Sequence, residues 1–350
     1  MKIAALVSGG VDSSVALCLL KDQGHDVTAF YLKIWLNDEL SYLGDCPWQD
    51  DLYHVQAVCE KLQVPLIIVS LQQEYHDRIV SYTIEQVKQG KTPNPDMLCN
   101  QFIKFGLFFE KIDASYEKVA TGHYAQLITI DNNYVLRQSP DSVKDQTYFL
   151  SRLTQQQLAR CLFPIGHLHK SDVRALAHQF AMPNKERKDS QGICFLGKFK
   201  FRDFIKHHIG QRTGDLIEYE TGKKIGTHEG FWFYTIGQRQ GLRLAGGPWY
   251  VVAKNMSHNI VYVSRSYYAP EKNRTVLTVH DCHWLSGIVP SRQELRVKLR
   301  HGAPFNNALI TYNSPTSCHL VLQENDQGIA AGQFVVFYHD NDCLGSGIIA

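Results

Sequence analysis

The chain has 350 residues, of which 44% are hydrophobic and 20% charged, and its formal net charge is +2. This length predicts two or three domains, and the composition is ordinary for a globular protein. No stretch approaches the roughly 18 consecutive apolar residues of a membrane span, and the apolar run at the N-terminus is too short for a signal peptide. The nine cysteines lack the CxxC or Cys/His spacing of zinc sites. These features argue against a membrane protein and a secreted disulfide scaffold, and they predict free thiols in the cytoplasm.

Strand and helix signals alternate through the first half of the chain. We expect strands at 2–7, 27–32, 66–69 and 118–121, and helices at 12–23, 52–62, 74–88 and 102–112. This alternation predicts a Rossmann-like α/β domain, in which helices cover both faces of a parallel sheet. Ligands of such sheets bind at the carboxyl ends of the strands.

After about residue 201 the pattern changes to short alternating runs between Gly, Pro, Asn and Asp clusters. These runs lie at 250–253, 260–263, 275–279, 295–299, 319–322 and 334–338. Such runs are typical of compact β-domains. We therefore predict a catalytic domain at 1–206, a small central β-rich domain at 207–270 and a C-terminal β-barrel at 271–350.

The most specific local motif is SGGVDSS at 8–14, directly between the first strand and the first helix. Its two glycines let the backbone approach an anion closely, and Ser13, Ser14 and the opening amides of the helix can donate to phosphate. Asp12 can bind magnesium or order the loop. The motif lacks the GxxxxGK[ST] of Walker-type loops. It resembles the PP-loop of the ATP pyrophosphatases, which cut ATP between the α and β phosphates and adenylate an oxygen before a nucleophile displaces AMP.

Two cysteines stand in unusual surroundings. Cys99 follows two prolines and precedes the predicted helix at 102–112, so the helix amides and Lys104 should stabilise its thiolate. Cys194 lies between glycines, after the basic run at 185–188, which also favours a thiolate. Low-pKa thiols suit a nucleophile or a leaving group in thiol–disulfide exchange. The alternative for either residue is a buried structural cysteine.

Six further motifs follow the PP-loop in order and span essentially the whole chain. They are TPNPDMLCNQFIKF at 92–105, ATGHYA at 120–125, KDQTYFL at 144–150, LFPIG at 162–166, KDSQGICFLG at 188–197 and TIGQRQGL at 235–242. Together they closely resemble the bacterial tRNA-specific 2-thiouridylases of the MnmA type. The resemblance implies ATP-dependent 2-thiolation of the tRNA wobble uridine, with adenylation of its 2-oxo group. A persulfide on Cys194 supplies the sulfur, by direct attack or after Cys99 releases it as sulfide, and a transient Cys99–Cys194 disulfide is left.

The resemblance also implies a set of site residues. Cys99, Cys194 and Asp96 would be catalytic, with Asp96 as an acid or base near the pyrimidine. ATP, with Mg²⁺ on its phosphates and possible help from Asp12, would contact Leu6, Val7, Ser8, Gly9, Gly10, Val11, Asp12, Ser13, Ser14, Leu32 and Gly122. The anticodon loop of the tRNA would contact Asn94, Pro95, Asp96, His123, Lys144, Asp145, Gln146, Arg300, His301 and Gln333. A cysteine desulfurase or sulfur-relay protein would load Cys194, and we expect a monomer that does not bind a membrane.

The stretch at 185–206 is the most basic part of the chain. It holds seven basic and three acidic residues, which gives +4. Four phenylalanines are interleaved with these charges: Phe195, Phe199, Phe201 and Phe204. Basic residues position phosphates and aromatic rings stack on unpaired bases, so the stretch predicts an RNA-binding surface. The alternative is a solvated basic face over a phenylalanine core.

Two other functions compete with this interpretation. A PP-loop enzyme such as an amidating ligase or lysidine synthetase uses ammonia or an amine as nucleophile and needs no cysteine pair. A nucleotide-dependent RNA-binding or sensor protein would release neither AMP nor pyrophosphate. A requirement for the two cysteines and the release of AMP and pyrophosphate therefore distinguish the three functional hypotheses.

Overall fold

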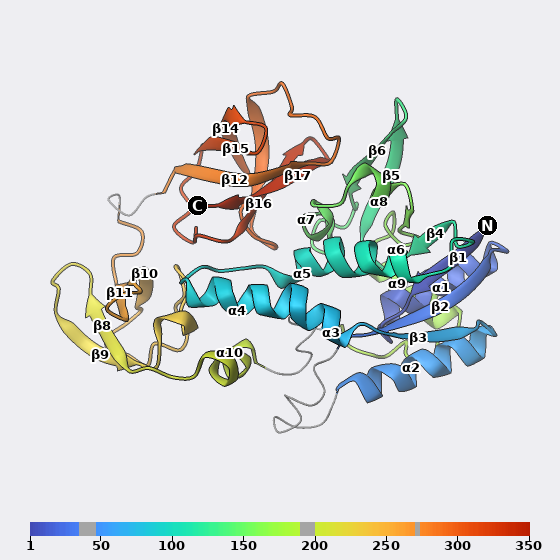
Figure 1. The fold of residues 1–350 in the computed structure, drawn as a ribbon, viewed down its shortest axis with the longest axis horizontal. Helices are drawn as coiled ribbons and strands as arrows, with labels where there is room; N and C mark the ends of the chain where they lie inside the picture. Colours follow the sequence, from blue (N-terminus) through green and yellow to red (C-terminus); the bar gives the residue numbers. More distant parts are fainter. Residues whose placement is uncertain (35–46, 190–199, 270–273) are drawn as a thin grey trace.

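Three β-sheets organise the protein (Figure 1). The computed structural model describes residues 1–34, 47–189, 200–269 and 274–350. Within those ranges no helix is long and apolar enough to cross a membrane. A five-stranded parallel sheet comes first, a four-stranded sheet forms the centre, and an eight-stranded sheet contains a closed barrel. The predicted fold class is confirmed. The domain boundaries near Lys206 and Pro270 remain predictions, and Pro270 lies outside the described residues.

The parallel sheet has the order β3-β2-β1-β4-β7. Its strands are β1 (Lys2–Leu6), β2 (Asp26–Lys33), β3 (Leu66–Ser70), β4 (Lys118–Ala120) and β7 (Cys161–Leu162). The helices α1 (Val11–Asp22), α2 (Pro47–Leu62) and α9 (Lys170–Gln179) pack on one face. Ile3 and Ala5 belong to the core on this face, whereas Ala4 belongs to the core on the other. Because successive strand residues point to opposite faces, the first strand is buried on both sides, as its apolar run predicted.

Two long helices cover the other face. One runs through α3 (Gln72–Tyr75), a π-helical stretch at His76–Val80 and α4 (Ser81–Lys88). The other runs through α5 (Pro95–Leu98), a π-helical stretch at Cys99–Leu107 and α6 (Phe108–Lys111). The first was predicted at 74–88, and the prediction is confirmed.

The predicted start of the second helix, at 102, was wrong. Asn94 caps the helix through its Oδ1, which accepts from the amides of Asp96 (3.2 Å) and Met97 (3.4 Å). Pro95 occupies the first helical position, where its fixed φ and missing amide cost nothing. The prolines therefore begin this helix, whereas we had expected them to precede it.

A hairpin of the first domain extends the barrel sheet. Its strands β5 (Ala125–Ile130) and β6 (Asn133–Gln138) were not predicted, and β6 pairs with the last strand of the chain. Asp131 and Asn132 form the turn with positive φ. Two such residues between alternating runs are the sequence signal that would have found it. Three further short helices lie between β6 and the central sheet. They are α7 (Thr147–Leu150), α8 (Gln155–Leu158) and α10 (Phe201–Ile209).

The two β-domains have separate cores. The central sheet, in the order β10-β11-β8-β9, contains β8 (Gly214–Glu218), β9 (Lys224–His228), β10 (Tyr250–Asn255) and β11 (Ile260–Ser264), beside a 3₁₀ turn at Phe231–Phe233. The barrel contains β12 (Val276–Trp284), β13 (Glu294–Lys298), β14 (Asn306–Ser314), β15 (Ser317–Leu322), β16 (Phe334–His339) and β17 (Asp342–Ile349). It closes because β12 pairs with both β15 and β17. Each alternating run predicted after residue 201 falls on one of these strands.

The segment that leads into α5 contacts both β-domains. Lys254, on β10, donates to the carbonyl oxygens of Gly90 and Tyr234. On the opposite side, the amide of Thr92 donates to the barrel carbonyl of Ala331 at 2.8 Å. The start of the Cys99 helix is thus held by the central domain and by the barrel together.

Candidate active site at the carboxyl edge of the parallel sheet

The nucleotide loop lies where the strand order of the parallel sheet reverses. The chain leaves β1 for β2 on one side, whereas β4 lies on the other. Crevices at such a point are the usual ligand sites of α/β sheets. Val7 extends the β1 pairing through its amide, which donates to Phe30 O at 2.9 Å, and α1 begins four residues later. Gly10 precedes α1 and gives it no side-chain cap, so the opening amides of the helix face the loop.

Serine hydroxyls fix the shape of this loop. The Ser13 hydroxyl accepts from the Ser8 amide (3.2 Å) and donates to Gly10 O (3.1 Å), and the Ser14 hydroxyl donates to the same carbonyl at 2.9 Å. Asn184 braces the loop from outside, because its Nδ2 donates to Gly9 O (2.7 Å) and to Ser14 Oγ (2.9 Å). The two serines predicted to bind phosphate therefore also hold the loop together.

Gly122 packs directly against the first turn of α1. A Cβ on this residue would lie 2.7 Å from Ser13 N and 2.8 Å from the carbonyl carbon of Asp12. Those atoms are backbone and cannot move aside cheaply. The predicted ATP contact at Gly122 is thus a site where only glycine fits.

A network of charges surrounds Asp12. Its Oδ1 accepts from Tyr124 Oη (2.8 Å) and Lys170 Nζ (2.7 Å). The same Lys170 ammonium lies 2.8 Å from Asp189 Oδ1, and Lys144 Nζ lies 2.7 Å from Asp189 Oδ2. Burial by itself would raise the pKa of Asp189, but hydrogen bonds from Lys144 and Lys170 outweigh it and hold that pKa at about 2. Both carboxylates are therefore held next to lysine ammonium groups.

These residues fit a magnesium–triphosphate ligand. The loop amides and Lys170 offer donors and positive charge for phosphate oxygens, and Asp12 offers a carboxylate of the kind Mg²⁺ takes beside phosphates. The described residues contain no group of three or more His, Cys, Asp or Glu that could hold a metal by themselves. A magnesium ion that arrives with the nucleotide would find its protein ligand in Asp12.

Cys99 does not have the surroundings that its sequence predicted. It lies in the second turn of the helix that begins at Pro95, so the opening amides do not reach it. Its side chain is fully buried, and burial raises the pKa of the thiol to about 11. Lys104 and a hydrogen bond from Tyr75 act against that shift and are the weaker influence. The prediction of a low pKa was wrong, because the thiol is buried and because the helix begins at Pro95, before Cys99. Cys194, its predicted partner, lies outside the described residues.

This burial predicts how Cys99 reacts in the free protein. We expect alkylation of Cys99 by iodoacetamide to accelerate about tenfold per pH unit up to a pKa near 11, since only the thiolate reacts. Peptide mass mapping of the intact protein between pH 7 and 10 measures the rate, with the buried Cys59, whose pKa burial also raises to about 11, as internal reference. A rate that levels off near pH 7 would show instead the low-pKa thiol expected from the sequence.

One pair of residues joins the nucleotide loop to the cysteine helix. Gly122 touches the loop, and its neighbour His123 packs its ring 6.1 Å from the ring of Phe105, in the same helix as Cys99. The ring also lies 6.0 Å from Phe163, and Nδ1 is 2.7 Å from Thr121 Oγ1. Burial lowers the pKa of His123 well below its ordinary value, so the imidazole is neutral. His123 thus lies between the nucleotide loop and the helix of Cys99. Its contact with tRNA stays a prediction.

Comparison with known proteins identifies the family. A family model described as "tRNA methyl transferase HUP domain" matches residues 1–198, and models for a PRC-barrel domain and an aminomethyltransferase β-barrel domain match 202–265 and 274–349. The "tRNA-specific 2-thiouridylase MnmA" of Parabacteroides distasonis is 47% identical over all of this chain and 99% of its own length. Relatives of the same description in Porphyromonas gingivalis and Bacteroides thetaiotaomicron are 43% and 42% identical over all of this chain. The chain belongs to the MnmA family.

Apart from His123, the residues that the MnmA resemblance assigned to tRNA fall into three places. Asn94, Pro95 and the half-buried Asp96 form the capped start of α5. The barrel loops contain Arg300, His301 and Gln333. Arg300 pairs with Asp326 at 2.9 Å. Gly332, next to Gln333, lies against Lys91 and Thr92. His301 packs its ring 4.5 Å from Phe149, and its Nε2 is 3.3 Å from Asp145 O. The barrel loops and the α5 segment thus form one continuous region.

The third place is the turn at 144–146, whose side chains bind within the protein. The Asp145 side chain is buried and accepts from Gln138 Nε2 (3.1 Å), the Ser139 amide (3.2 Å) and Thr147 Oγ1. Its side chain stabilises the folded turn, and the contact of Asp145 with tRNA stays a prediction. Lys144 binds Asp189, and Gln146 Oε1 accepts from the Tyr124 amide at 3.0 Å, so both neighbours brace the nucleotide site.

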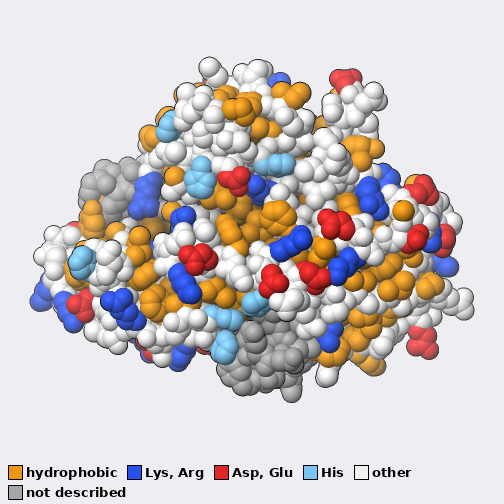
Figure 2. All heavy atoms as spheres, viewed as in Figure 1, with side chains coloured by type: hydrophobic (Ala, Val, Ile, Leu, Met, Phe, Trp, Pro, Cys, Tyr) orange, Lys and Arg blue, Asp and Glu red, His pale blue; other side chains and the backbone are white. Residues whose placement is uncertain are grey.

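The basic stretch after Lys185 is only partly described. Residues 190–199, with Phe195 and Phe199, lie outside the description, but α10 carries Arg202 and Lys206 at the surface. Phe204 is fully buried, so this ring belongs to the protein core. The prediction that it stacks on an RNA base was therefore wrong. Figure 2 shows lysine and arginine side chains gathered over the central domain, at the lower left of this face.

Sequence reasoning missed several residues of this MnmA-family site. Tyr124, Lys170, Arg174 and Asn184 all contact the loop or its charge network. They come from α9, from the residue before β5 and from the turn after α9, far from the SGGVDSS motif in sequence. No spacing rule points to a first-turn helix lysine such as Lys170, because only the parallel packing of α9 beside α1 brings it to Asp12.

Proposed function

We propose that this chain uses ATP to adenylate the 2-oxo group of the wobble uridine of tRNA and replaces that oxygen with sulfur from a persulfide on Cys194. The single observation that carries the proposal is the contact made by two consecutive residues. Gly122 abuts the nucleotide loop, and His123 packs against the helix that holds Cys99. These two contacts support the proposal that activation and sulfur chemistry take place next to each other. Full-length likeness to 2-thiouridylases supplies the substrate class.

The first half of the reaction belongs to the nucleotide loop. The uridine 2-oxygen attacks the α-phosphorus, and pyrophosphate leaves with the electrons of the broken bond. Lys170 and the opening amides of α1 stabilise the negative charge that builds on the phosphates. Asp12 would hold a magnesium ion, which would neutralise further phosphate charge. A urea-type oxygen leaves poorly by itself, and adenylation turns it into AMP.

The second half belongs to the cysteines. The terminal persulfide sulfur attacks C2 of the uridine and AMP leaves, while Cys99 attacks Cys194 Sγ and a Cys99–Cys194 disulfide forms. In the alternative order, Cys99 first frees the sulfur as hydrosulfide, which then attacks C2. An external thiol reductant restores both thiols. In either order Cys99 must lose its proton, and the half-buried Asp96, one turn earlier in the helix, is the proposed acceptor.

The cysteines provide the decisive test. We expect Cys99→Ala and Cys194→Ala to lower 2-thiouridine formation by more than about 100-fold, because each removes a covalent step. The assay contains tRNA, ATP and a cysteine desulfurase as sulfur donor, with nucleosides analysed by mass spectrometry. Cys59→Ala, a buried cysteine on α2, is the matched control and should behave as wild type.

The same assay separates the competing functions. Full thiolation by either cysteine variant would exclude the persulfide mechanism and favour an amine nucleophile. Absence of AMP and pyrophosphate with wild-type protein would indicate a binding protein. A methylated nucleoside in place of a thiolated one would support the activity named in the family-model description. We place the reaction in the cytoplasm, with a desulfurase or sulfur-relay protein as the partner that loads Cys194.

A further inference from the structure

Two cysteines of the barrel lie in contact, away from the proposed active site. Cys282 is on β12 and Cys318 is on the neighbouring strand β15, and their Sγ atoms are 3.8 Å apart. All seven cysteines that the structure describes are free thiols. The thiolation reaction uses neither member of this pair.

A β-bulge creates the contact. Regular alternation would continue the inward positions 277 and 279 of β12 to 281, but the register shifts between His280 and His283. Asp281 takes a left-handed conformation with φ of 49° and points outward, so Cys282 becomes the next buried residue. Its amide donates to Thr316 O at 3.0 Å, which fixes it beside Cys318, the partner of Val279 across the strands. Bulges re-aim side chains in this way.

The two thiols are not equivalent. A hydrogen bond from Cys318 lowers the pKa of Cys282, whereas the same contact and burial raise the pKa of Cys318. Cys282 retains 7% exposure and Cys318 has none. Cys282 is therefore the thiol that a small oxidant reaches first, and Cys318 is the thiol in contact behind it.

We propose that Cys282 and Cys318 form a peroxide-sensitive dithiol that closes a disulfide between β12 and β15. The Cys282 thiol ionises, its thiolate attacks one peroxide oxygen, and the O–O bond breaks. The hydroxide that leaves takes up the proton released by the thiol, so a sulfenic acid and one water result. The Cys318 thiol then attacks the sulfenic sulfur, the S–O bond breaks, and a second water leaves. Two thiols are oxidised to one disulfide while hydrogen peroxide is reduced to two waters, and an external dithiol reverses the change.

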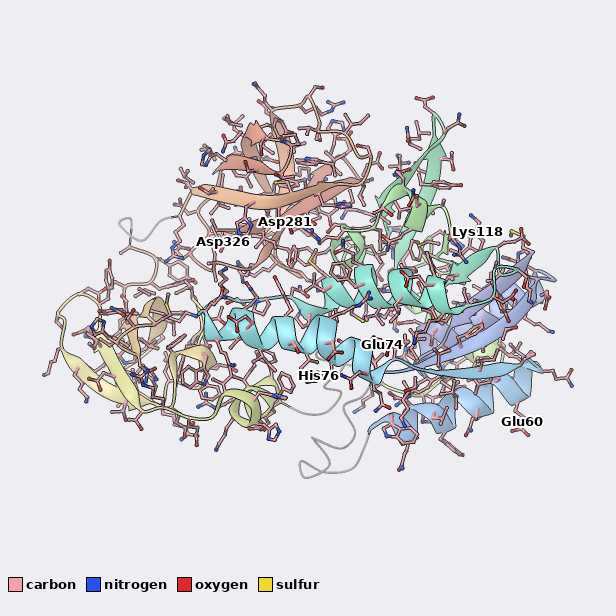
Figure 3. The ribbon with its side chains drawn as sticks, in the orientation of Figure 1. Glu60, Glu74, His76, Lys118, Asp281 and Asp326 are labelled. Carbon is pink, nitrogen blue, oxygen red and sulfur yellow. The ribbon has the colours of Figure 1, made fainter. Side chains whose placement is uncertain are left out.

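The position of the dithiol gives its oxidation a route to the catalytic domain. Asp281, adjacent to Cys282, lies on the side of the barrel that faces the long helices (Figure 3). It holds Arg152 through its carbonyl oxygen (3.1 Å) and its carboxylate (2.9 Å). Arg152 Nε in turn donates to Gln101 Oε1 at 3.1 Å, two residues after Cys99. The dithiol is one residue away from a contact that docks the barrel on the Cys99 helix.

Peptide mapping of the intact protein tests the proposal without any tRNA assay. The protein is treated with hydrogen peroxide, denatured, alkylated and digested, with and without prior reduction by dithiothreitol. We expect a cross-linked pair of peptides containing Cys282 and Cys318, and recovery of both alkylated peptides after reduction. Recovery of both in alkylated form without reduction, or a disulfide from either residue to another cysteine, would overturn the proposal.

Two variants and a control test the order of the steps. In Cys318→Ala the sulfenic acid has no partner, so dimedone should trap it at Cys282 in proportion to the peroxide added. In Cys282→Ala we expect Cys318 to stay reduced, because it is buried and its pKa is raised. Cys343→Ala, which removes another buried barrel cysteine, should form the disulfide as wild type does. Dimedone labelling of Cys318 in place of Cys282 would contradict the assigned roles.

Discussion

Gly122→Ala is expected to reduce AMP formation by about 100-fold or more. A Cβ at this position would lie 2.7 Å from Ser13 N and 2.8 Å from the carbonyl carbon of Asp12, so the first turn of α1 must move. A displacement of about 1 Å in a binding loop typically costs about two orders of magnitude in rate. The overlap should also lower the free energy of unfolding by about 1–3 kcal/mol. Pyrophosphate release with tRNA and ATP measures the first effect, and urea unfolding measures the second.

A glycine beyond the other end of α1 provides the control for this variant. Gly24 follows the helix with φ of 77° and has no atom within 4 Å of its ideal Cβ position. Asparagine tolerates that backbone conformation, so Gly24→Asn should keep both the rate and the stability of wild type. If Gly122→Ala released pyrophosphate at the wild-type rate, the loop would be more tolerant than its close backbone contact implies, and Gly122 would have no part in nucleotide binding.

Lys170→Met should lower the rate of AMP formation by about 100- to 1,000-fold while tRNA affinity stays unchanged. The side chain keeps its length but loses the charge that contacts both Asp12 and Asp189. Removing one preorganised donor from a phosphate site typically has an effect of this size. The two carboxylates would also face each other without their shared cation, which we expect to cost about 1–3 kcal/mol of stability. Initial rates over a range of ATP concentrations, with tRNA binding in parallel, measure the change.

A surface lysine in an ion pair is the matched control for Lys170. Lys111 pairs with Glu74, and both side chains are about one-third exposed. Lys111→Met should therefore change stability by less than about 1 kcal/mol and leave AMP formation intact. A purely structural role of Lys170 would appear as lower stability with kcat unchanged in the folded fraction, and that outcome would remove Lys170 from the proposed mechanism.

The fold was largely predictable because it follows from local patterns. Apolar runs with helical or strand periodicity placed the parallel sheet, and alternating runs placed strands of both β-domains. The failures have local causes too. The hairpin β5–β6 was not predicted because the Asp131-Asn132 turn signal was overlooked. The start of the Cys99 helix was placed too late because Pro95 was taken to lie outside the helix.

The candidate site was predictable only in its motif residues. The SGGVDSS loop stands in the structure at the carboxyl edge of the sheet, between β1 and α1, where the alternation of strands and helices had placed it. Its supporting residues Lys170 and Asn184 lie in no motif, and Tyr124 lies in the ATGHYA motif without having been predicted to contact the loop. All three come from segments that are distant in sequence. Their roles depend on which helices lie side by side, and that information is not local.

The sequence by itself determined the fold class, the position of the nucleotide loop and the likeness to tRNA 2-thiouridylases, because periodicity, glycine-rich turns and collinear motifs are properties of short segments. Only the tertiary structure decided that Cys99 is buried with a raised pKa, that Lys170 shares its charge between Asp12 and Asp189, and that Cys282 meets Cys318 across a bulge. The physical reason is the same in each case. Burial, electrostatic pairing and sulfur contact depend on atoms brought together from remote parts of the chain, and their magnitude is set by the packing around them.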